Sequence, residues 1–173
     1  MNPLLTIVAY NPRWPTLFEL ERLCVQRALG DKLLAIEHIG STAVPGLAAK
    51  PIVDLMVAVR DITVACASLD PLRAIGYDER TSQGDHPEWF YCLGKPLERD
   101  THCHLHLVKT HSDFWMRHLR FRNALRADPG LARRYESLKR ELATQYADDR
   151  EGYTNAKSAF IESVIERVTT DCG

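Results

Sequence analysis

Hydrophobic and polar positions follow two different periods along the chain, which predicts a mixed α/β fold. Apolar residues recur at helical spacing after Trp14, so we expect a helix over residues 15–29. Residues 35–39 alternate polar and apolar side chains, and residues 52–59 are almost wholly apolar, so both segments are predicted strands. Residues 63–75 return to a helical pattern, although they contain a proline.

The second half of the chain completes this picture. Residues 89–93 and 103–108 predict two further strands, joined by a polar connection at residues 94–96 that suits a hairpin. Three apolar stripes at helical spacing follow, separated at Pro129 and Gly152, and predict three helices. The expected fold class is therefore α/β (α+β), a small mixed β-sheet flanked by helices, with a helical C-terminal third.

Composition narrows the domain organisation and the classes of function that are expected for this chain. The 173 residues contain neither repeats nor a long linker, so a single domain over residues 1–173 is expected. The formal net charge of −1 lacks the basic excess of proteins that bind polymeric nucleic acid. An odd number of scattered cysteines predicts reduced, mostly buried thiols and no disulfide framework. Without a signal-like N-terminus or an apolar run of about 18 residues, a cytoplasmic protein with no membrane partner is expected. The sequence is also compatible with a homo-oligomer.

Gly40, Ser41 and Asp54 form the most informative pattern in the sequence. Glycine lets the main chain approach a phosphate, and the serine that ends the strand adds a hydroxyl beside the backbone amides. Asp54 is the only charge in the apolar strand, where a carboxylate without a partner would cost several kcal/mol. It could hold a divalent cation that bridges the phosphate. The alternatives are an ordinary turn at Gly40-Ser41 and a strand-end cap or salt bridge at Asp54.

This pattern resembles the signature of DNA polymerase beta-type nucleotidyltransferases, in which Gly-Ser precedes a strand bearing Asp-x-Asp or Asp-x-Glu at about this spacing. The resemblance implies that Asp54 is a catalytic, metal-binding residue. Met56 occupies the position of the second acid, on the same strand face as Asp54. A thioether is a poor ligand for Mg²⁺, so two-metal nucleotidyl transfer does not follow from the pattern alone.

A longer string is similar to the GrpB family, which is placed in the nucleotidyltransferase fold. The string is HIGSTAVPGLAAKPIVD at residues 38–54, reinforced by YNPRWP at 10–15, HLH at 104–106, FR at 121–122 and YTNAK at 153–157. The resemblance covers essentially the whole chain and implies the fold more strongly than any reaction, because the family has no well-settled activity. Methionine at position 56 is ordinary for it. Related domains are fused to dephospho-CoA kinase.

Histidines offer a second group of ligands. His104 and His106 share one face of their predicted strand with His102, and imidazoles two residues apart can share a metal. In the parent superfamily a third acid lies in this region, so the two could replace it beside Asp54. Such a set would favour Zn²⁺ or Mn²⁺ over Mg²⁺. The alternative is a polar strand face of hydrogen-bonded imidazoles. Four other histidines are expected to pack, cap helices or lie at the surface: His38, His86, His111 and His118.

Lys50 and Lys157 are the candidate cations for a phosphate. Lys50 lies in the loop between Ser41 and Asp54, and Lys157 follows Tyr153 by one turn on the last predicted helix. For both, a solvated lysine is the competing interpretation. The leading hypothesis is a nucleotidyltransferase-like protein that binds a nucleotide or phosphorylated small molecule with a divalent metal (Mg, Mn or Zn). The rivals are a non-catalytic nucleotide-binding module, linked to coenzyme A biosynthesis, and a metal-dependent phosphohydrolase.

Overall fold

A mixed sheet with helices on both faces forms the protein, as the computed structural model describes it for residues 6–82, 89–98 and 100–170. The strands are β1 (Ala35–Ile39), β2 (Ile52–Val59), β3 (Asp78–Ser82), β4 (Trp89–Glu98) and β5 (Thr101–Lys109). The helices are α1 (Trp14–Leu29), α2 (Ile62–Cys66), α3 (Leu69–Ala74), α4 (Asp113–Ala127), α5 (Pro129–Gln145) and α6 (Arg150–Thr170), with short 3₁₀ turns η2 (Gly30–Lys32) and η3 (Ser41–Ala43). The predicted fold class is confirmed.

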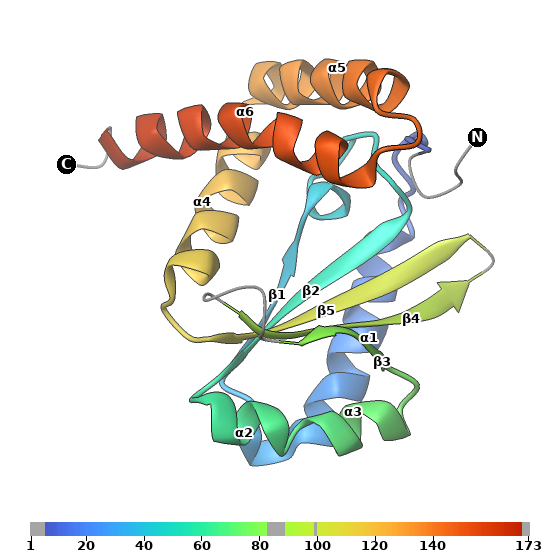
Figure 1. Cartoon of the computed structure of the whole chain (residues 1–173), viewed down its shortest axis with the longest axis vertical. Coiled ribbons are helices and arrows are strands. Elements are labelled where there is room, and N and C mark those ends of the chain that lie inside the picture. The colour runs from blue at the N-terminus through green and yellow to red at the C-terminus, as the bar shows by residue number, and fades with distance from the viewer. Residues whose placement is uncertain (1–5, 83–88, 99, 171–173) are drawn as a thin grey trace.

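The five strands lie in the order β1-β2-β5-β4-β3 (Figure 1). β2 runs parallel to β5, and the other neighbouring pairs are antiparallel. Because β2 and β5 are in register, Asp54 lies opposite His104 and Met56 opposite His106. Side chains that share a register position point to the same face of a sheet, so this pairing brings the predicted site residues of two distant segments together.

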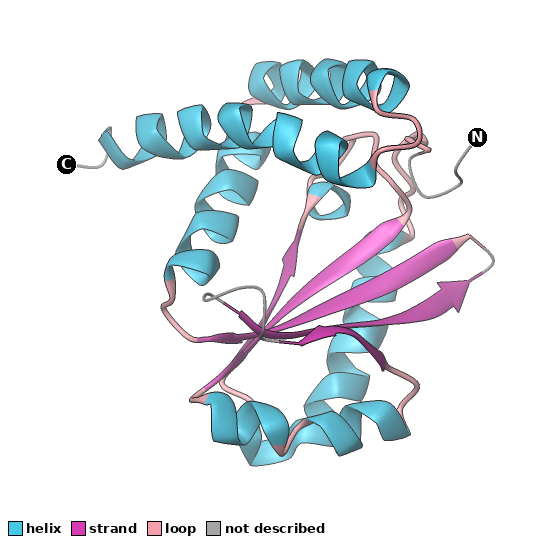
Figure 2. Cartoon of the chain, viewed as in Figure 1, coloured by secondary structure: helices cyan, strands magenta, loops and turns pink. Residues whose placement is uncertain are grey.

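Each face of the sheet is covered by a different group of helices (Figure 2). One face packs against α1, α2 and α3, and its continuous core contains Leu55 and Leu105 together with Trp14 of α1. The other face meets α4, whose Phe114 and Trp115 pack on Met56. Helices α5 and α6 then pack with α4 above this second face and join loop 44–47 in a third apolar cluster. Within the described chain, no helix has the length and apolarity to cross a lipid bilayer.

Helix boundaries follow from local chemistry. α1 begins with Pro15 in its first turn, and its buried residues recur at helical spacing from Trp14 to Leu29. The side chain of Asp128 accepts hydrogen bonds from the backbone N–H groups of Gly130 and Leu131, so the break between α4 and α5 is also the N-cap of α5. The predicted separation at Pro129 is therefore confirmed.

Three boundary predictions were wrong. Residues 94–96 lie within β4 and not in a hairpin connection, because both strands of this pair extend further and Pro96 sits at a register irregularity that tolerates a residue without an N–H. The helical segment 63–75 is divided into α2 and α3, with Pro71 inside the first turn of α3. Gly152 lies inside the first turn of α6, so the break before that helix comes earlier.

The cysteines are less buried than expected. Cys103 is buried in the sheet, whereas Cys24 and Cys66 are exposed and Cys92 is intermediate. The expected mostly buried thiols were therefore wrong. Cys24 occupies the solvent side of α1, between its buried positions, which a helical period of 3.6 residues allows for a small side chain. These four cysteines are free thiols.

Candidate functional site

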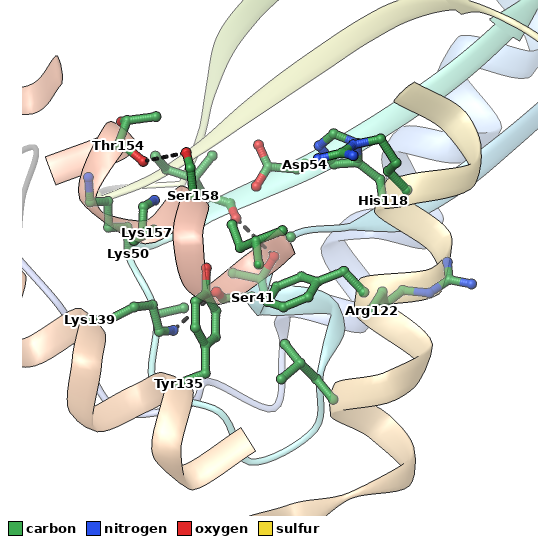
Figure 3. Close-up of a pocket in the computed structure, with 18 of the residues that line it drawn as sticks. Ser41, Lys50, Asp54, His118, Arg122, Tyr135, Lys139, Thr154, Lys157 and Ser158 are labelled. Carbon is green, nitrogen blue, oxygen red and sulfur yellow. Dashed lines mark hydrogen bonds between the residues drawn. The ribbon is translucent and has the colours of Figure 1, made fainter. Parts of the chain in front are cut away.

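A cavity of about 580 Å³ lies between the second face of the sheet and helices α4, α5 and α6 (Figure 3). Its floor comes from the end of β1, from β2 and from β5, and its walls come from the three helices. The seven candidate phosphate and metal ligands from the sequence all line this cavity: Gly40, Ser41, Lys50, Asp54, His104, His106 and Lys157. The structure therefore brings the predicted site residues together in one place.

Gly40 makes the close approach between the turn and the acidic strand. Its φ of +73° lies in the left-handed region that favours glycine. A Cβ added at this position would collide with the carboxylate of Asp54, so glycine is required by space as well as by backbone conformation. Ser41 follows at the start of η3, with its side chain toward the cavity.

Asp54 forms a charge cluster with the two predicted histidines. Its Oδ1 lies 3.6 Å from Nδ1 of His104 and 3.8 Å from Nε2 of His106. Burial raises the pKa of Asp54, but the hydrogen bond with His106 and the positive charge of both imidazoles outweigh it and hold this pKa below its ordinary value. Burial lowers the pKa of His106, yet Asp54 and Cys92 raise it to about 10. At neutral pH the cluster is an imidazolium–carboxylate pair.

This cluster differs from an assembled metal centre. Within the described ranges, no group of three or more His, Cys, Asp or Glu side chains has an arrangement that could hold a metal ion. Met56, at the position of the second acid, is fully buried against Phe114 and Trp115. The protonated form of His106 donates and cannot ligate. Metal binding by Asp54, His104 and His106 therefore stays a prediction, although the three side chains do meet.

Two lysines approach one tyrosine on another wall of the cavity. Nζ of Lys50 lies 4.0 Å from the centroid of the Tyr153 ring, and Nζ of Lys157 lies 4.3 Å from it. Burial raises the pKa of Tyr153 to about 12, so the ring stays neutral. An ammonium over an aromatic face is attracted by the ring quadrupole. Tyr153 thus holds both cations at the cavity, where an anionic ligand could contact them.

Lys139 of α5 is a functional candidate that the sequence reasoning missed. It is only 2% exposed and lines the cavity, and its Nζ donates hydrogen bonds to Oγ of Ser41, at 3.1 Å, and to the carbonyl of Ala48. Burial, together with the positive charges of Lys157, Arg140 and Lys50, lowers its pKa to about 7 against the opposing charge of Glu136. The signal was present in the sequence, because position 139 continues the apolar stripe of α5.

His118 corrects another expectation. It was expected at the surface or at a helix cap, but it lines the cavity near Asp54, stacked on Phe114 with 3.9 Å between ring centroids. Its Nδ1 donates to the carbonyl of Phe114 at 2.8 Å, because a carbonyl can only accept. Burial lowers the pKa of His118 to about 4, so the ring is neutral. The lone pair is therefore on Nε2.

Two other histidines, His38 and His111, lie away from this group. His38 points to the α1 side, where it stacks on Phe18 and its Nε2 lies 3.1 Å from Oγ1 of Thr42, which agrees with the expected packing role. His111 is an exposed residue before α4. The expectation for His86 falls outside the described residues.

Polar contacts of α4 hold the cavity walls in position. Nη1 of Arg122 donates to Glu37 at 2.6 Å and to the carbonyl of His38 at 2.9 Å, which ties α4 to β1 directly before Gly40. Arg117 pairs with Glu162 and so ties α4 to α6. These two arginines are therefore structural links around the site.

Comparison of the whole fold with solved structures places it in a known class. The chain is similar to the Cid1 poly(U) polymerase bound to MgGTP, with a TM-score of 0.57 at 16% identity, over 87% of this chain and 50% of that one. At this identity the likeness concerns the fold alone. The fold of this chain is thus similar to that of a nucleotidyltransferase.

Closer relatives identify the family. The model of the GrpB protein family matches residues 4–167, so the chain belongs to the GrpB family. It is 34% identical to the conserved protein GrpB from Enterococcus faecalis, with a TM-score of 0.82 over 96% of this chain and 98% of that chain. It is also 32% identical over 164 residues to the glutamate-rich protein GrpB of Alkalihalophilus pseudofirmus, covering 94% of each chain.

Proposed function

We propose that the protein binds a nucleotide, or a phosphorylated small molecule of similar size, in the cavity under α6. The observation that carries this proposal is the meeting of Ser41, Lys50 and Lys157 in one cavity with the carboxylate of Asp54 on its floor. Lysines and a hydroxyl are suitable partners for phosphate oxygens, and a cavity of about 580 Å³ is within the range of ordinary small-molecule sites. Gly40, which has no side chain, lets the turn that carries Ser41 lie directly beside the carboxylate of Asp54.

The apolar part of the same cavity suits a base or another flat group. Phe114 and Phe121 of α4 and Ile161 of α6 line it. Small-molecule sites usually combine such apolar walls with a few converging polar groups. A ligand with an anionic end and an apolar end therefore fits better than inorganic phosphate alone. The MgGTP in the structure of Cid1, a distant relative in fold, is a compound of this kind.

A divalent cation fits this site only with help from the ligand. Asp54 supplies a suitable oxygen ligand, but position 56, where a second carboxylate would lie, is a buried methionine. Phosphate oxygens of the ligand would therefore complete the coordination of Mg²⁺. Mn²⁺ or Zn²⁺ would instead recruit His104 and His106 after these lose their protons. When bound, such a cation neutralises charge on the phosphates and supports metal-dependent phosphoryl or nucleotidyl transfer.

Binding without transfer is the second candidate, and Met56 is the observation that favours it. A module that kept the fold and the phosphate contacts, but not the second acid, would bind the ligand as a sensor or as support for a coenzyme A pathway enzyme. The two candidates share the cavity and differ in whether product forms when the metal is added.

A thermal-shift and calorimetry panel tests the binding proposal. The panel contains ATP, GTP, UTP and coenzyme A precursors, each with Mg²⁺, Mn²⁺ or Zn²⁺, on wild type, Lys157→Met and Asp54→Ala. Free ligand at 100 times Kd stabilises the native state by about 2.7 kcal/mol, which is a readily measured increase in Tm. We expect Lys157→Met to weaken binding with or without metal, and Asp54→Ala to abolish only the metal-dependent part.

The matched control is Lys32→Met, which removes an exposed lysine outside the cavity. It should leave every shift unchanged. If no compound in the panel stabilises wild type, or if Lys32→Met and Lys157→Met reduce the shifts equally, the proposed function is wrong.

A further inference from the structure

We propose that Ser41 is a nucleophile, with Lys139 as its general base, and that it accepts the terminal phosphoryl group of a nucleoside triphosphate held in the cavity. This inference rests on the proposed function for its ligand, but the reactivity of Ser41 can be tested without it. The proposal concerns a covalent step and not the phosphate contact that the same hydroxyl could make.

The geometry around Ser41 is that of an activated hydroxyl. Its Oγ lies 3.1 Å from Nζ of Lys139, and the hydroxyl of Tyr135 is also hydrogen-bonded to it. Lys139 is almost fully buried behind Ser41, whereas Ser41 itself is partly exposed at the cavity surface. A ligand in the cavity would therefore reach the serine, and Figure 3 shows the amine of Lys139 beside the hydroxyl of Ser41. A nucleophile within hydrogen-bond reach of a base is the signature of covalent catalysis.

The surroundings of Lys139 favour an amine that can take a proton near neutral pH. Burial, together with the positive charges of Lys157 of α6, Arg140 of α5 and Lys50 of the loop, lowers its pKa to about 7 against the opposing charge of Glu136 of α5. Its ammonium lies 5.0 Å from the centroid of the Tyr135 ring. Burial keeps the hydroxyl of Tyr135 protonated by raising its pKa, so Tyr135 is no competing base. A base whose pKa is close to the working pH is the most effective one.

The step balances without any further reactant. Oγ of Ser41 forms a bond to the terminal phosphorus as the bond from that phosphorus to its bridging oxygen breaks. The hydroxyl proton moves to Nζ of Lys139, and the nucleoside diphosphate leaves with the electron pair of the broken bond. Proton transfer turns Lys139 into an ammonium directly beside the new phosphoserine, where the two opposite charges stabilise each other. Lys50 and Lys157 line the same cavity, on the side that would hold the phosphates of the leaving diphosphate.

The first experiment measures the nucleophile alone, with a fluorophosphonate. Such a probe forms a bond from serine oxygen to phosphorus with loss of fluoride, and peptide mass spectrometry locates the adduct. We expect the adduct on Ser41, with a labelling rate that rises as pH increases through about 7, where Lys139 loses its proton. Lys139→Arg keeps the charge but cannot act as a base, so it should lower the rate by about a hundredfold or more and remove the inflection.

Two control variants keep this experiment selective. Ser41→Ala should abolish the adduct, whereas Ser163→Ala, which removes an exposed serine of α6 outside the cavity, should leave labelling unchanged. If Lys139→Arg does not fold, the pH profile of wild type still tests the base. An absence of adduct on Ser41, or a rate that does not change between pH 6 and pH 9 by about tenfold or more, would overturn the proposal.

The second experiment tests the transferred group. Wild type is incubated with ATP or GTP and Mg²⁺ or Mn²⁺, and the peptide that contains Ser41 is examined for one added phosphoryl group and for its loss in Ser41→Ala. A fluorophosphonate adduct without phosphoserine from either nucleotide would overturn the phosphoryl step. The thermal-shift panel is independent of both results, because a nucleotide can bind beside a serine that does not react.

Discussion

The two faces of the central sheet are built from the same strands but differ in what they bury. On β2 the residues 53, 55, 57 and 59 point into the continuous core against α1, and all are fully buried. The intervening positions face the α4 side, where Asp54 lines the cavity and Met56 packs against Phe114. On β5, Leu105 and Leu107 belong to the first core, and His104 and His106 line the cavity.

This difference explains how one apolar strand can carry a carboxylate. The period of two along a strand places Asp54 away from the core that stabilises the sheet. The imidazoles of His104 and His106 on the neighbouring strand offset the free-energy cost of taking its carboxylate out of water. The core face provides stability, and the opposite face is divided into an apolar end at Met56 and a polar end at Asp54. Substitutions on the two faces should therefore separate stability from ligand binding.

The largest effect is expected on the core face. Leu55→Ala removes a fully buried side chain from the cluster between the sheet and α1 and should lower the free energy of unfolding by about 2–5 kcal/mol. Met56→Leu, its neighbour on the other face, keeps the volume and should cost less than about 1.5 kcal/mol. Urea unfolding followed by circular dichroism measures both. Equal losses would contradict the division between the faces.

A smaller but still clear loss is expected at the turn beside the acid. Gly40→Ala places a side chain at a positive φ and against the carboxylate of Asp54, so we expect about 1–2 kcal/mol of destabilisation from the backbone alone, together with displacement of Asp54. The same substitution at Gly46, which also has a positive φ but has nothing within 4 Å of its added Cβ, should show the backbone cost only. The difference between the Tm losses of the two variants measures the destabilisation that comes from the collision with Asp54.

The charge cluster on the cavity floor should give stability that depends on pH. The pKa of His106 is raised from 6.5 to about 10, so its contribution is fully present below pH 6.5 and is lost as pH rises through about 10. The pKa of Asp54 lies below 3.8, so its contribution is present above that pH and is lost in stronger acid. Asp54→Asn should therefore lower the free energy of unfolding most between pH 4 and pH 6.5, by about 1 kcal/mol or less because the side chain is 24% exposed, and Tm measured across the pH range follows this loss.

The matched variant for this comparison is Asp31→Asn, an exposed aspartate outside the cluster. Its Tm difference from wild type should stay small across the same pH range. A Tm difference for Asp54→Asn that is as large at pH 10 as at pH 6 would contradict the ion pair.

The smallest effect on stability should accompany a clear effect on binding. Lys157→Met keeps an apolar side chain of similar length over Tyr153, so the free energy of unfolding should change by less than about 0.5 kcal/mol. Affinity for a nucleotide should fall about tenfold, which corresponds to one hydrogen bond to a charged group. Isothermal titration calorimetry at two salt concentrations measures the loss. Unchanged affinity would remove Lys157 from the site.

Most of the fold could be predicted from local patterns, because strands β1 and β2 and the three C-terminal helices have clear periods. The errors at residues 94–96 and at Gly152 have a common cause: proline and glycine interrupt a pattern in the sequence, but sheet pairing and the first turn of a helix tolerate them. Strand periodicity predicted that His104 and His106 share one face, whereas their position beside Asp54 was expected only from the resemblance to the nucleotidyltransferase superfamily.

Lys139 and His118 could not be placed in the same way. Each lies on a helix whose orientation over the sheet depends on packing with other helices, and no local spacing specifies that orientation. A lysine at a buried position of an amphipathic helix was the available signal for the first. For His118, only the position of α4 relative to Asp54 distinguishes a cavity residue from a surface one.

Both backbone polar groups of Ala48 are hydrogen-bonded to side chains of α5. Its N–H donates to Glu136, and its carbonyl accepts from Lys139, three residues further along the helix. Two side chains of the helix thus bond the backbone N–H and carbonyl of one loop residue, as the backbone of a neighbouring strand would. Inserting a single residue between them would rotate one side chain by about 100° relative to the other. The loop between Ser41 and Asp54 would then lose its alignment with the C-terminal helices, which makes the spacing of three residues a requirement for assembling the cavity.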